Sequence, residues 1–178
     1  MKVNYAIIPE CYADTNLVET ITNSFNSFNH QKSCNEVSRT MQSPRLNDAF
    51  ALGIIDKDKR SIKYMESFQP VIQKENLYLF KHPDKHHYII QIYPAIEKFI
   101  LDSVEETGLN IENFGLPGEL EALKKITKRQ TSRNNSSLRR LFIELKNNNA
   151  KQIVILSKWI SYLKEHTYNS NMEEIKEY

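Results

Sequence analysis

Acidic side chains follow two apolar segments of this 178-residue chain, at the points where each segment turns polar. Glu10 comes after a short apolar run, with Asp14 four residues later, and Asp56 and Asp58 come directly after a longer one. In an extended segment, residues i and i+2 project to the same side, so Asp56 and Asp58 can point at one place. Converging carboxylates repel one another unless a cation lies between them, and such hard oxygen ligands suit Mg²⁺ or Mn²⁺.

The same acids have an ordinary alternative role. Acidic residues after strands often cap helices or lie in solvated turns, and Asp14 is a candidate cap for the helix that follows it. A D-x-D pair standing alone is a weak motif. The spacing by itself therefore leaves a metal site and a set of helix caps as alternatives.

The elements that position these acids are predicted from the periodicity of apolar residues. We expect strands at residues 5–8, 33–37, 49–55, 77–81 and 88–93. We expect helices from Asp14 or Thr15 to about residue 28, from Pro94 to the stop at Gly108, and at residues 117–129, 137–146 and 150–167. Helices alternate with strands in the first half, which predicts an α/β fold with a mostly parallel sheet flanked by helices, and a helical C-terminal part.

This pattern divides the chain into three parts. Residues 1–110 are predicted to form the α/β domain, residues 111–168 a helical extension packed on it, and residues 169–178 a frayed, charged tail. In open α/β sheets, ligands bind outside the carboxyl ends of the strands. The acids stand at such ends, so we expect the functional site there.

Two stretches, IIPECYADTNLVETI and FALGIIDKDKR, resemble the Toprim signature. In that signature an apolar strand ends in Glu, an Asp follows four residues on, and a later apolar strand ends in D-x-D. Toprim domains occur in type IA and II topoisomerases, bacterial primases and the overcoming-lysogenization-defect (OLD) family nucleases, and the chain is most similar to the OLD branch. Residues 96–100 look like the helix start that follows the D-x-D region in that branch, whereas Cys11 stands where a glycine usually follows the first acid.

The resemblance implies Mg²⁺- or Mn²⁺-dependent cleavage or transfer at a phosphodiester of DNA or RNA. The four acids named above would be the metal ligands, with Asp14 helping to anchor a second ion and Glu10 also serving as a general acid or base. Glu97 would be a further acidic group. Lys57, by its proximity, is a candidate for the lysine that such nucleases place near the phosphate.

A second hypothesis is a catalytically degenerate Toprim-like module that binds nucleic acid or a separate ATPase protein. OLD-like Toprim domains usually share a chain with an ATPase, and this chain has no phosphate-binding glycine loop among its four glycines. A third is an unrelated α/β domain. The resemblance to Toprim domains also suggests a role in defence against phage, in which such domains often serve. No apolar run approaches the length of a membrane span, and we expect a cytoplasmic protein without membrane contact.

Basic side chains gather in the predicted helical part, although the net charge of the whole chain is only +2. This stretch either follows a nucleic-acid backbone or is a solvated helical face. The candidate nucleic-acid-binding residues are Lys124, Lys125, Lys128, Arg129, Arg133, Arg139 and Arg140.

Two further groups of residues are candidates for a chemical role, one as a metal site and one as a nucleophile. His82, Asp84, His86 and His87 could ligate a transition metal, but they lack a metal motif, and a solvated hairpin turn is the favoured alternative. Cys11 is expected to be an incidental thiol, because neighbouring carboxylates raise the pKa of a thiol and make it a poor nucleophile.

Overall fold

The computed structural model describes residues 3–57 and 63–178, which form an α/β fold around one five-stranded mixed sheet. The strand order is β1-β2-β5-β4-β3. β1 (Ile7–Pro9), β2 (Ala51–Asp56) and β5 (His87–Ile92) run parallel. β4 (Leu77–Lys81) is antiparallel to β5, and β3 (Gln69–Lys74) is antiparallel to β4. The predicted α/β class with a mostly parallel core is therefore confirmed.

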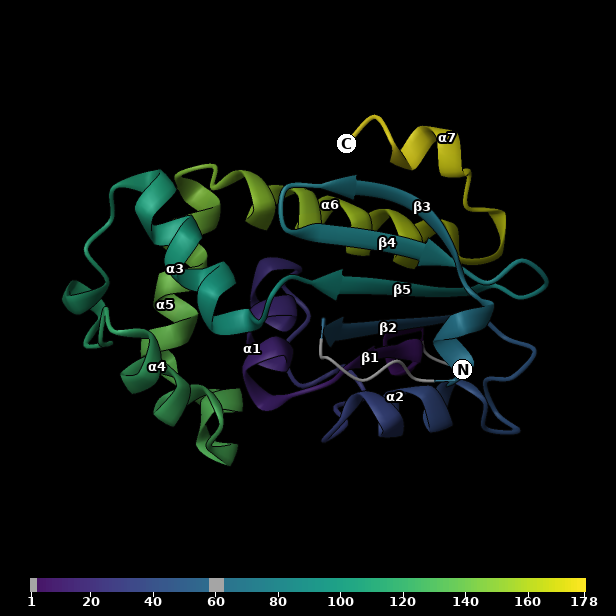
Figure 1. Cartoon of the computed structure of the whole chain (residues 1–178), viewed down its shortest axis with the longest axis horizontal. Coiled ribbons are helices and arrows are strands. Elements are labelled where there is room, and N and C mark those ends of the chain that lie inside the picture. The colour runs from purple at the N-terminus through teal and green to yellow at the C-terminus, as the bar shows by residue number, and fades with distance from the viewer. Residues whose placement is uncertain (1–2, 58–62) are drawn as a thin grey trace.

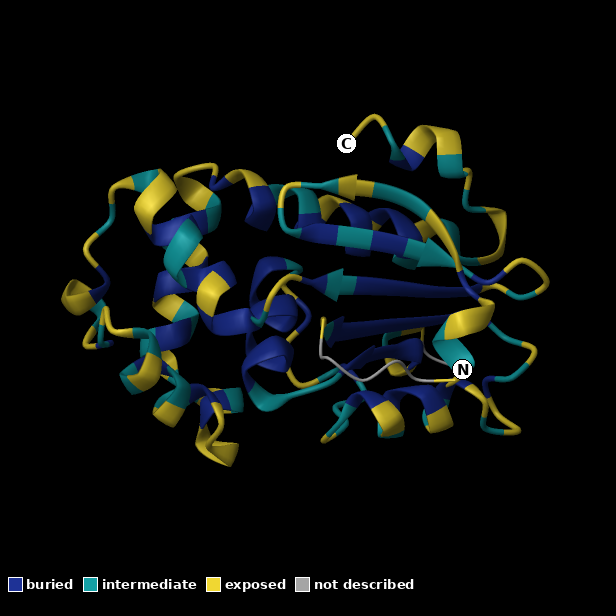
Figure 2. Ribbon diagram, in the orientation of Figure 1, coloured by how far each residue is buried: buried dark blue, intermediate teal, exposed yellow. Residues whose placement is uncertain are grey.

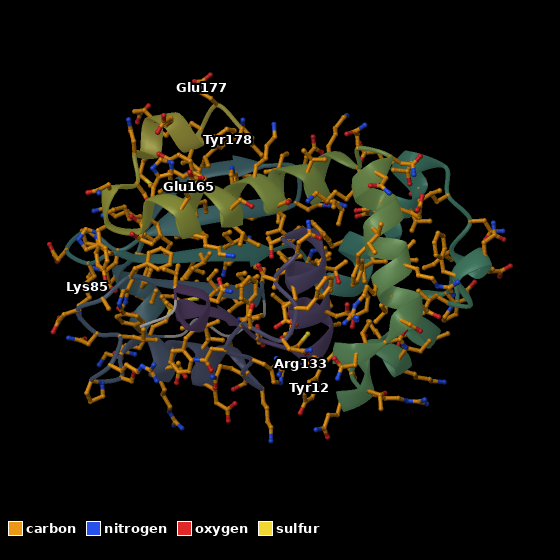
Figure 3. The ribbon with its side chains drawn as sticks, turned by 180° about the vertical axis from the view of Figure 1, so that it is seen from behind. Tyr12, Lys85, Arg133, Glu165, Glu177 and Tyr178 are labelled. Atoms are coloured by element: carbon orange, nitrogen blue, oxygen red, sulfur yellow. The ribbon has the colours of Figure 1, made fainter. Side chains whose placement is uncertain are left out.

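The α-helices of the described ranges surround this sheet. Figure 3 shows α6 in front of the sheet as seen from behind, and Figure 1 shows α1, α3, α4 and α5 gathered beyond the carboxyl ends of β2 and β5. The helices are α1 (Tyr12–Ile21), α2 (Cys34–Met41), α3 (Ile96–Thr107), α4 (Leu120–Thr127), α5 (Ser136–Asn147), α6 (Lys151–His166) and α7 (Met172–Ile175).

β2 lies at the centre of the parallel core, and Figure 2 shows it, like β5, buried along almost its whole length. Its Gly53 permits close packing against α2. A Cβ atom at this position would lie 3.0 Å from Val37 Cγ1 and 3.2 Å from Met41 Sδ. The apolar run predicted as the central strand is thus covered on both faces, as expected for a parallel strand.

Residues 33–37, predicted as a strand, instead begin helix α2. Ser33 is the N-cap, and its side chain accepts a hydrogen bond from the Glu36 N–H at 3.3 Å. Val37 and Met41 are buried one helical turn apart, so the apolar positions follow a helical period. The prediction missed β3, whose side chains are mostly exposed or half-buried and therefore carry little alternation.

Polar side chains join the helical C-terminal half to α1. The Asn16 side-chain amide donates to the Ser132 carbonyl at 2.8 Å and to the Asn135 carbonyl at 3.1 Å. At the other end of α1, Ser157 Oγ donates to the Ile21 carbonyl at 3.0 Å, and Lys146 Nζ donates to the same oxygen. These contacts satisfy backbone carbonyls that would otherwise lack partners.

The end of the chain is packed rather than frayed, contrary to the prediction for residues 169–178. Ile175 of α7 is fully buried, and Tyr162 Oη donates to Glu174 Oε2 at 2.6 Å. Lys74 Nζ of β3 donates to the Lys176 carbonyl at 2.7 Å. One buried isoleucine in a charged segment is a weak sequence signal, which explains the error.

We expect Ile175→Asp to lower the free energy of unfolding by about 2 kcal/mol, because it places a charge in an apolar site and removes a buried side chain. Urea unfolding of this variant, with Glu177→Gln at an exposed position as control, measures the effect. A frayed tail would instead leave the Ile175→Asp curve superimposed on that of the wild type.

Candidate acidic site

Glu10 and Asp56 meet at the carboxyl ends of two neighbouring parallel strands. Glu10 follows β1, Asp56 ends β2, and the two strands are paired in register. The Glu10 N–H donates to the Ile54 carbonyl at 2.9 Å, and the Asp56 N–H donates to Glu10 Oε2 at 3.1 Å. The structure therefore brings together two of the predicted acids, Glu10 and Asp56.

Asp14 joins them through the N-terminus of α1. The helix begins at Tyr12, earlier than predicted, because Cys11 rather than Asp14 is the N-cap. The Asp14 N–H donates to Cys11 Sγ at 3.3 Å, and the Cys11 N–H donates to Asp14 Oδ2 at 3.1 Å, which is a capping box. The Cys11 thiol thus has a structural role as a helix cap. Asp14 Oδ1 is buried and has no hydrogen-bond partner among the described residues.

Glu97 and Asp56 both lie at the N-terminus of α3 and line the same cavity. The N-cap, Ala95, has no capping side chain, and the Ile96 N–H donates instead to Asp56 Oδ1 at 3.0 Å. Glu97 is buried in the first turn of α3 and accepts a hydrogen bond from Thr127 Oγ1 of α4 at 2.5 Å. Asp56 is therefore both a member of the acidic group and a cap of α3.

Burial and neighbouring carboxylates raise the pKa values of acids in this group. Burial raises the pKa of Asp14 to about 7, and the charges of Glu10 and Glu97 add to this effect. Burial and then the charges of Asp14 and Glu10 raise the pKa of Asp56 to about 10. Burial and then Asp14 raise the pKa of the Cys11 thiol well above its usual value, in agreement with the expectation of a poor nucleophile.

The donor set fits a hard divalent cation in kind, because the group offers carboxylate oxygens and Asp14 Oδ1 has no partner in the described part of the chain. Within residues 3–57 and 63–178, however, no three or more His, Cys, Asp or Glu side chains are arranged to hold an ion. One oxygen of each of Glu10, Asp14 and Asp56 already accepts a backbone N–H. Asp58, the other predicted ligand, lies outside the described residues.

A cavity of about 450 Å³ opens beside these acids. Its wall contains acidic side chains, lysines from two distant parts of the sequence, and the stacked rings of Tyr12 and His30. The lining residues are Cys11, Tyr12, His30, Lys32, Asp56, Ala95, Ile96, Glu97, Lys124, Thr127 and Lys128. This cavity is the candidate binding site, at the strand ends where the sequence placed it.

The predicted basic residues lie in different surroundings. Lys124 and Lys128 line the cavity, and Lys125 and Arg129 are exposed nearby on the same helical segment. The three arginines that follow have other contacts. Arg133 pairs with Glu19 at 3.5 Å, the Arg139 guanidinium lies 4.7 Å from the centre of the Phe25 ring, and Arg140 donates to the Phe114 carbonyl at 3.4 Å.

Lys57 lies away from the cavity. Its ammonium group is 4.8 Å from the centre of the Tyr78 ring and 4.9 Å from that of Tyr93. Its N–H continues the ladder with the Ile92 carbonyl. Because adjacent residues of an extended segment point to opposite faces, Lys57 and Asp56 diverge.

The histidine segment lies at the opposite end of the sheet. His87 is fully buried at the start of β5, where its Nδ1 lies 2.6 Å from Tyr64 Oη and its Nε2 lies 2.9 Å from the Leu46 carbonyl. His82 Nδ1 accepts from the Asp84 N–H at 3.1 Å, whereas His86 is exposed. His87 is therefore a hydrogen-bonded core residue, and the segment resembles a turn more than a metal site.

Four cavity residues were missed by the sequence analysis. Tyr12, His30, Lys32 and Thr127 come from α1, the loop after it and α4. None of them belongs to a local motif, and Thr127 is separated by 30 residues from the Glu97 that it contacts. Only the tertiary fold brings them together.

Comparison with known protein families, with curated proteins and with solved structures found no match for this chain. Among the helices of the described residues, none is both long enough and apolar enough to span a bilayer.

Proposed function

We propose that this protein is a divalent-cation-dependent phosphodiesterase that acts on nucleic acid, as its resemblance to Toprim domains implies. The observation that supports it most is the buried Asp14 Oδ1, which has no partner among residues 3–57 and 63–178 and lies in a group of acids whose charges raise the pKa values of Asp14 and Asp56. Such a group is stabilised by a cation, and the lysines on the cavity wall suit an anionic substrate.

In this proposal, Glu10, Asp14 and Asp56 hold the cation, together with Asp58. A bound divalent cation neutralises charge on a phosphate and lowers the pKa of a coordinated water. Lys124 and Lys128 bind phosphate oxygens at the mouth of the cavity. Thr127 fixes the Glu97 carboxylate by its hydrogen bond, which keeps this acid oriented toward the site.

The test is cleavage of a labelled oligonucleotide and of supercoiled plasmid with Mg²⁺ or Mn²⁺, with calorimetry of Mn²⁺ binding. We expect Asp14→Asn and Asp56→Asn to lower the cleavage rate by at least about 100-fold and to weaken Mn²⁺ binding. Asp84→Asn, at an exposed acid far from the site, is the matched control.

Cleavage that persists in both variants, or that needs no divalent cation, contradicts the proposal. Nucleic-acid binding without cleavage under any cation would instead favour the degenerate binding module.

A further inference from the structure

An aromatic pair forms part of the cavity wall. The rings of Tyr12 and His30 are stacked, with their centres 4.2 Å apart and their planes 27° from parallel. Tyr12 is the first residue of α1, and His30 lies in a loop that follows the edge of β1, where the Asn29 N–H donates to the Ile7 carbonyl at 2.9 Å. The pair therefore rests on two anchored segments.

The His30 ring is fixed in one tautomer by its neighbours. Thr15 Oγ1 donates its hydrogen to the Cys11 carbonyl at 2.7 Å, so the contact of 3.0 Å between Thr15 Oγ1 and His30 Nδ1 requires His30 to be the donor. Burial, and then the positive charge of Arg133, lowers the pKa of His30. The ring is thus neutral near pH 7 and held flat against Tyr12.

Two lysine side chains line the same cavity as this pair. Lys32 follows His30 in the same loop, and Lys128 comes from the end of α4. Both side chains are exposed, and within the described residues neither ammonium group has an ion pair or hydrogen bond. Arg133, which pairs with Glu19, is close enough for its charge to lower the pKa of His30, and Figure 3 labels it and Tyr12.

We propose that the Tyr12–His30 pair is a stacking platform for one unpaired base of a single-stranded nucleic acid, with Lys32 and Lys128 binding the phosphates on either side of it. This inference rests on the proposed function and specifies its substrate as single-stranded. A flat aromatic surface flanked by cations is the usual means of binding single strands without sequence preference. A base inside a duplex has both faces covered, and a cavity of about 450 Å³ is of a size to admit one nucleotide.

The test measures binding in EDTA, where no cleavage occurs. Fluorescence anisotropy with a labelled twelve-nucleotide oligothymidylate, its uridylate counterpart and a duplex of the same length compares the substrates. We expect both single strands to bind more tightly than the duplex. Tyr12→Ala should weaken single-strand binding roughly tenfold, whereas Tyr12→Phe, which keeps the ring, should bind like the wild type. Lys128→Gln should weaken binding and reduce its salt dependence.

Tyr168→Ala, at an exposed tyrosine of the chain's C-terminal segment, is the matched control. Quenching of a 2-aminopurine base by the wild-type protein gives a second readout that does not depend on the folding of Tyr12→Ala. Equal binding of Tyr12→Ala and Tyr12→Phe, absence of quenching, or a preference for the duplex would overturn the inference. Because Asp56→Asn cleavage is measured separately, failure of the stacking platform and failure of the proposed activity give different results.

Discussion

Asp14→Asn is expected to be more stable than the wild type at pH 7.5 in the presence of a chelator, and the advantage should shrink as the pH falls toward 4. The folded protein raises the pKa of Asp14 from 3.8 to about 7, chiefly by burial. The folded state therefore holds this proton where the unfolded state has released it. For a carboxyl group shifted upward, stability is lost as pH rises from the unfolded to the folded pKa.

The size of the effect follows from the shift. One pKa unit corresponds to about 1.4 kcal/mol, so a shift of this size gives on the order of 2 to 4 kcal/mol between pH 4 and pH 7. Asparagine keeps an oxygen that can accept from the Cys11 N–H, so the capping box survives the substitution. The variant should therefore lose the charge without losing the contact.

Urea unfolding in EDTA at pH 4.5, 6.0 and 7.5 measures this difference. The wild type must be compared with Asp14→Asn at each pH because other groups also make stability depend on pH. In particular, burial lowers the pKa of His30, His82 and His87. Their contribution to stability has the opposite sign, since it is lost as pH falls below 6.5. Asp84→Asn serves as the control for a change in net charge. A constant difference between Asp14→Asn and wild type across this range would show that Asp14 is ionised in the fold.

Addition of Mn²⁺ extends the test to the proposed function. A cation that binds only the folded wild type should raise its unfolding free energy at pH 7.5, whereas Asp14→Asn should gain much less. Stabilisation of both proteins to the same extent would place the cation elsewhere.

The sequence predicts this site well where the site depends on residues that are close together in the chain. Glu10 and Asp56 end apolar runs, and parallel strands bring their carboxyl ends to one edge, so their convergence follows from two short segments. The predicted strand at residues 77–81 and the predicted end of a helix at Gly108 are also confirmed. Both predictions rest on neighbouring residues, namely the alternation of apolar and polar side chains along the strand and a glycine that takes the left-handed conformation at the end of the helix.

The parts of the site that were not predicted depend on tertiary contacts. A basic stretch does not reveal which side chains face the cavity, since the turn between α4 and α5 directs Lys128 to the cavity and Arg133 to Glu19. His30 lies in a segment of polar residues without periodicity. Its position is set by backbone hydrogen bonds to β1 and by the buried Glu19. These partners are too far from His30 in the sequence to be predicted from a local pattern.

Glu19 organises the loop that leads to His30. This side chain, in the last half of α1, is only 2% exposed. Its carboxylate accepts backbone N–H groups from Asn26 at 2.9 Å, Ser27 at 3.0 Å and Phe28 at 3.0 Å. Arg133 lies 3.5 Å away and supplies the opposite charge. A buried anion with this many donors acts as a fixed centre for the turn after α1.

Glu19→Ala is therefore expected to lower the free energy of unfolding by about 3 kcal/mol or more, because it leaves backbone N–H groups and Arg133 without their acceptor in a buried region. Glu19→Gln keeps one acceptor oxygen of the same shape and should lose only part of this stability. Urea unfolding at pH 7.5 measures both variants, with Glu177→Gln as the exposed control.

The same loop positions His30 in the cavity wall. Because the proposed platform requires this position, Glu19→Gln should also weaken the binding of single-stranded nucleic acid, and the acidic group should be unchanged. Arg133→Ala distinguishes the effect of the ion pair from that of the loop geometry. It removes the cation but keeps the three backbone N–H bonds to Glu19. A loss in Glu19→Ala no larger than that in Arg133→Ala would mean that the ion pair, and not the backbone bonds, carries the stabilisation. A larger loss assigns the effect to the turn that Glu19 holds.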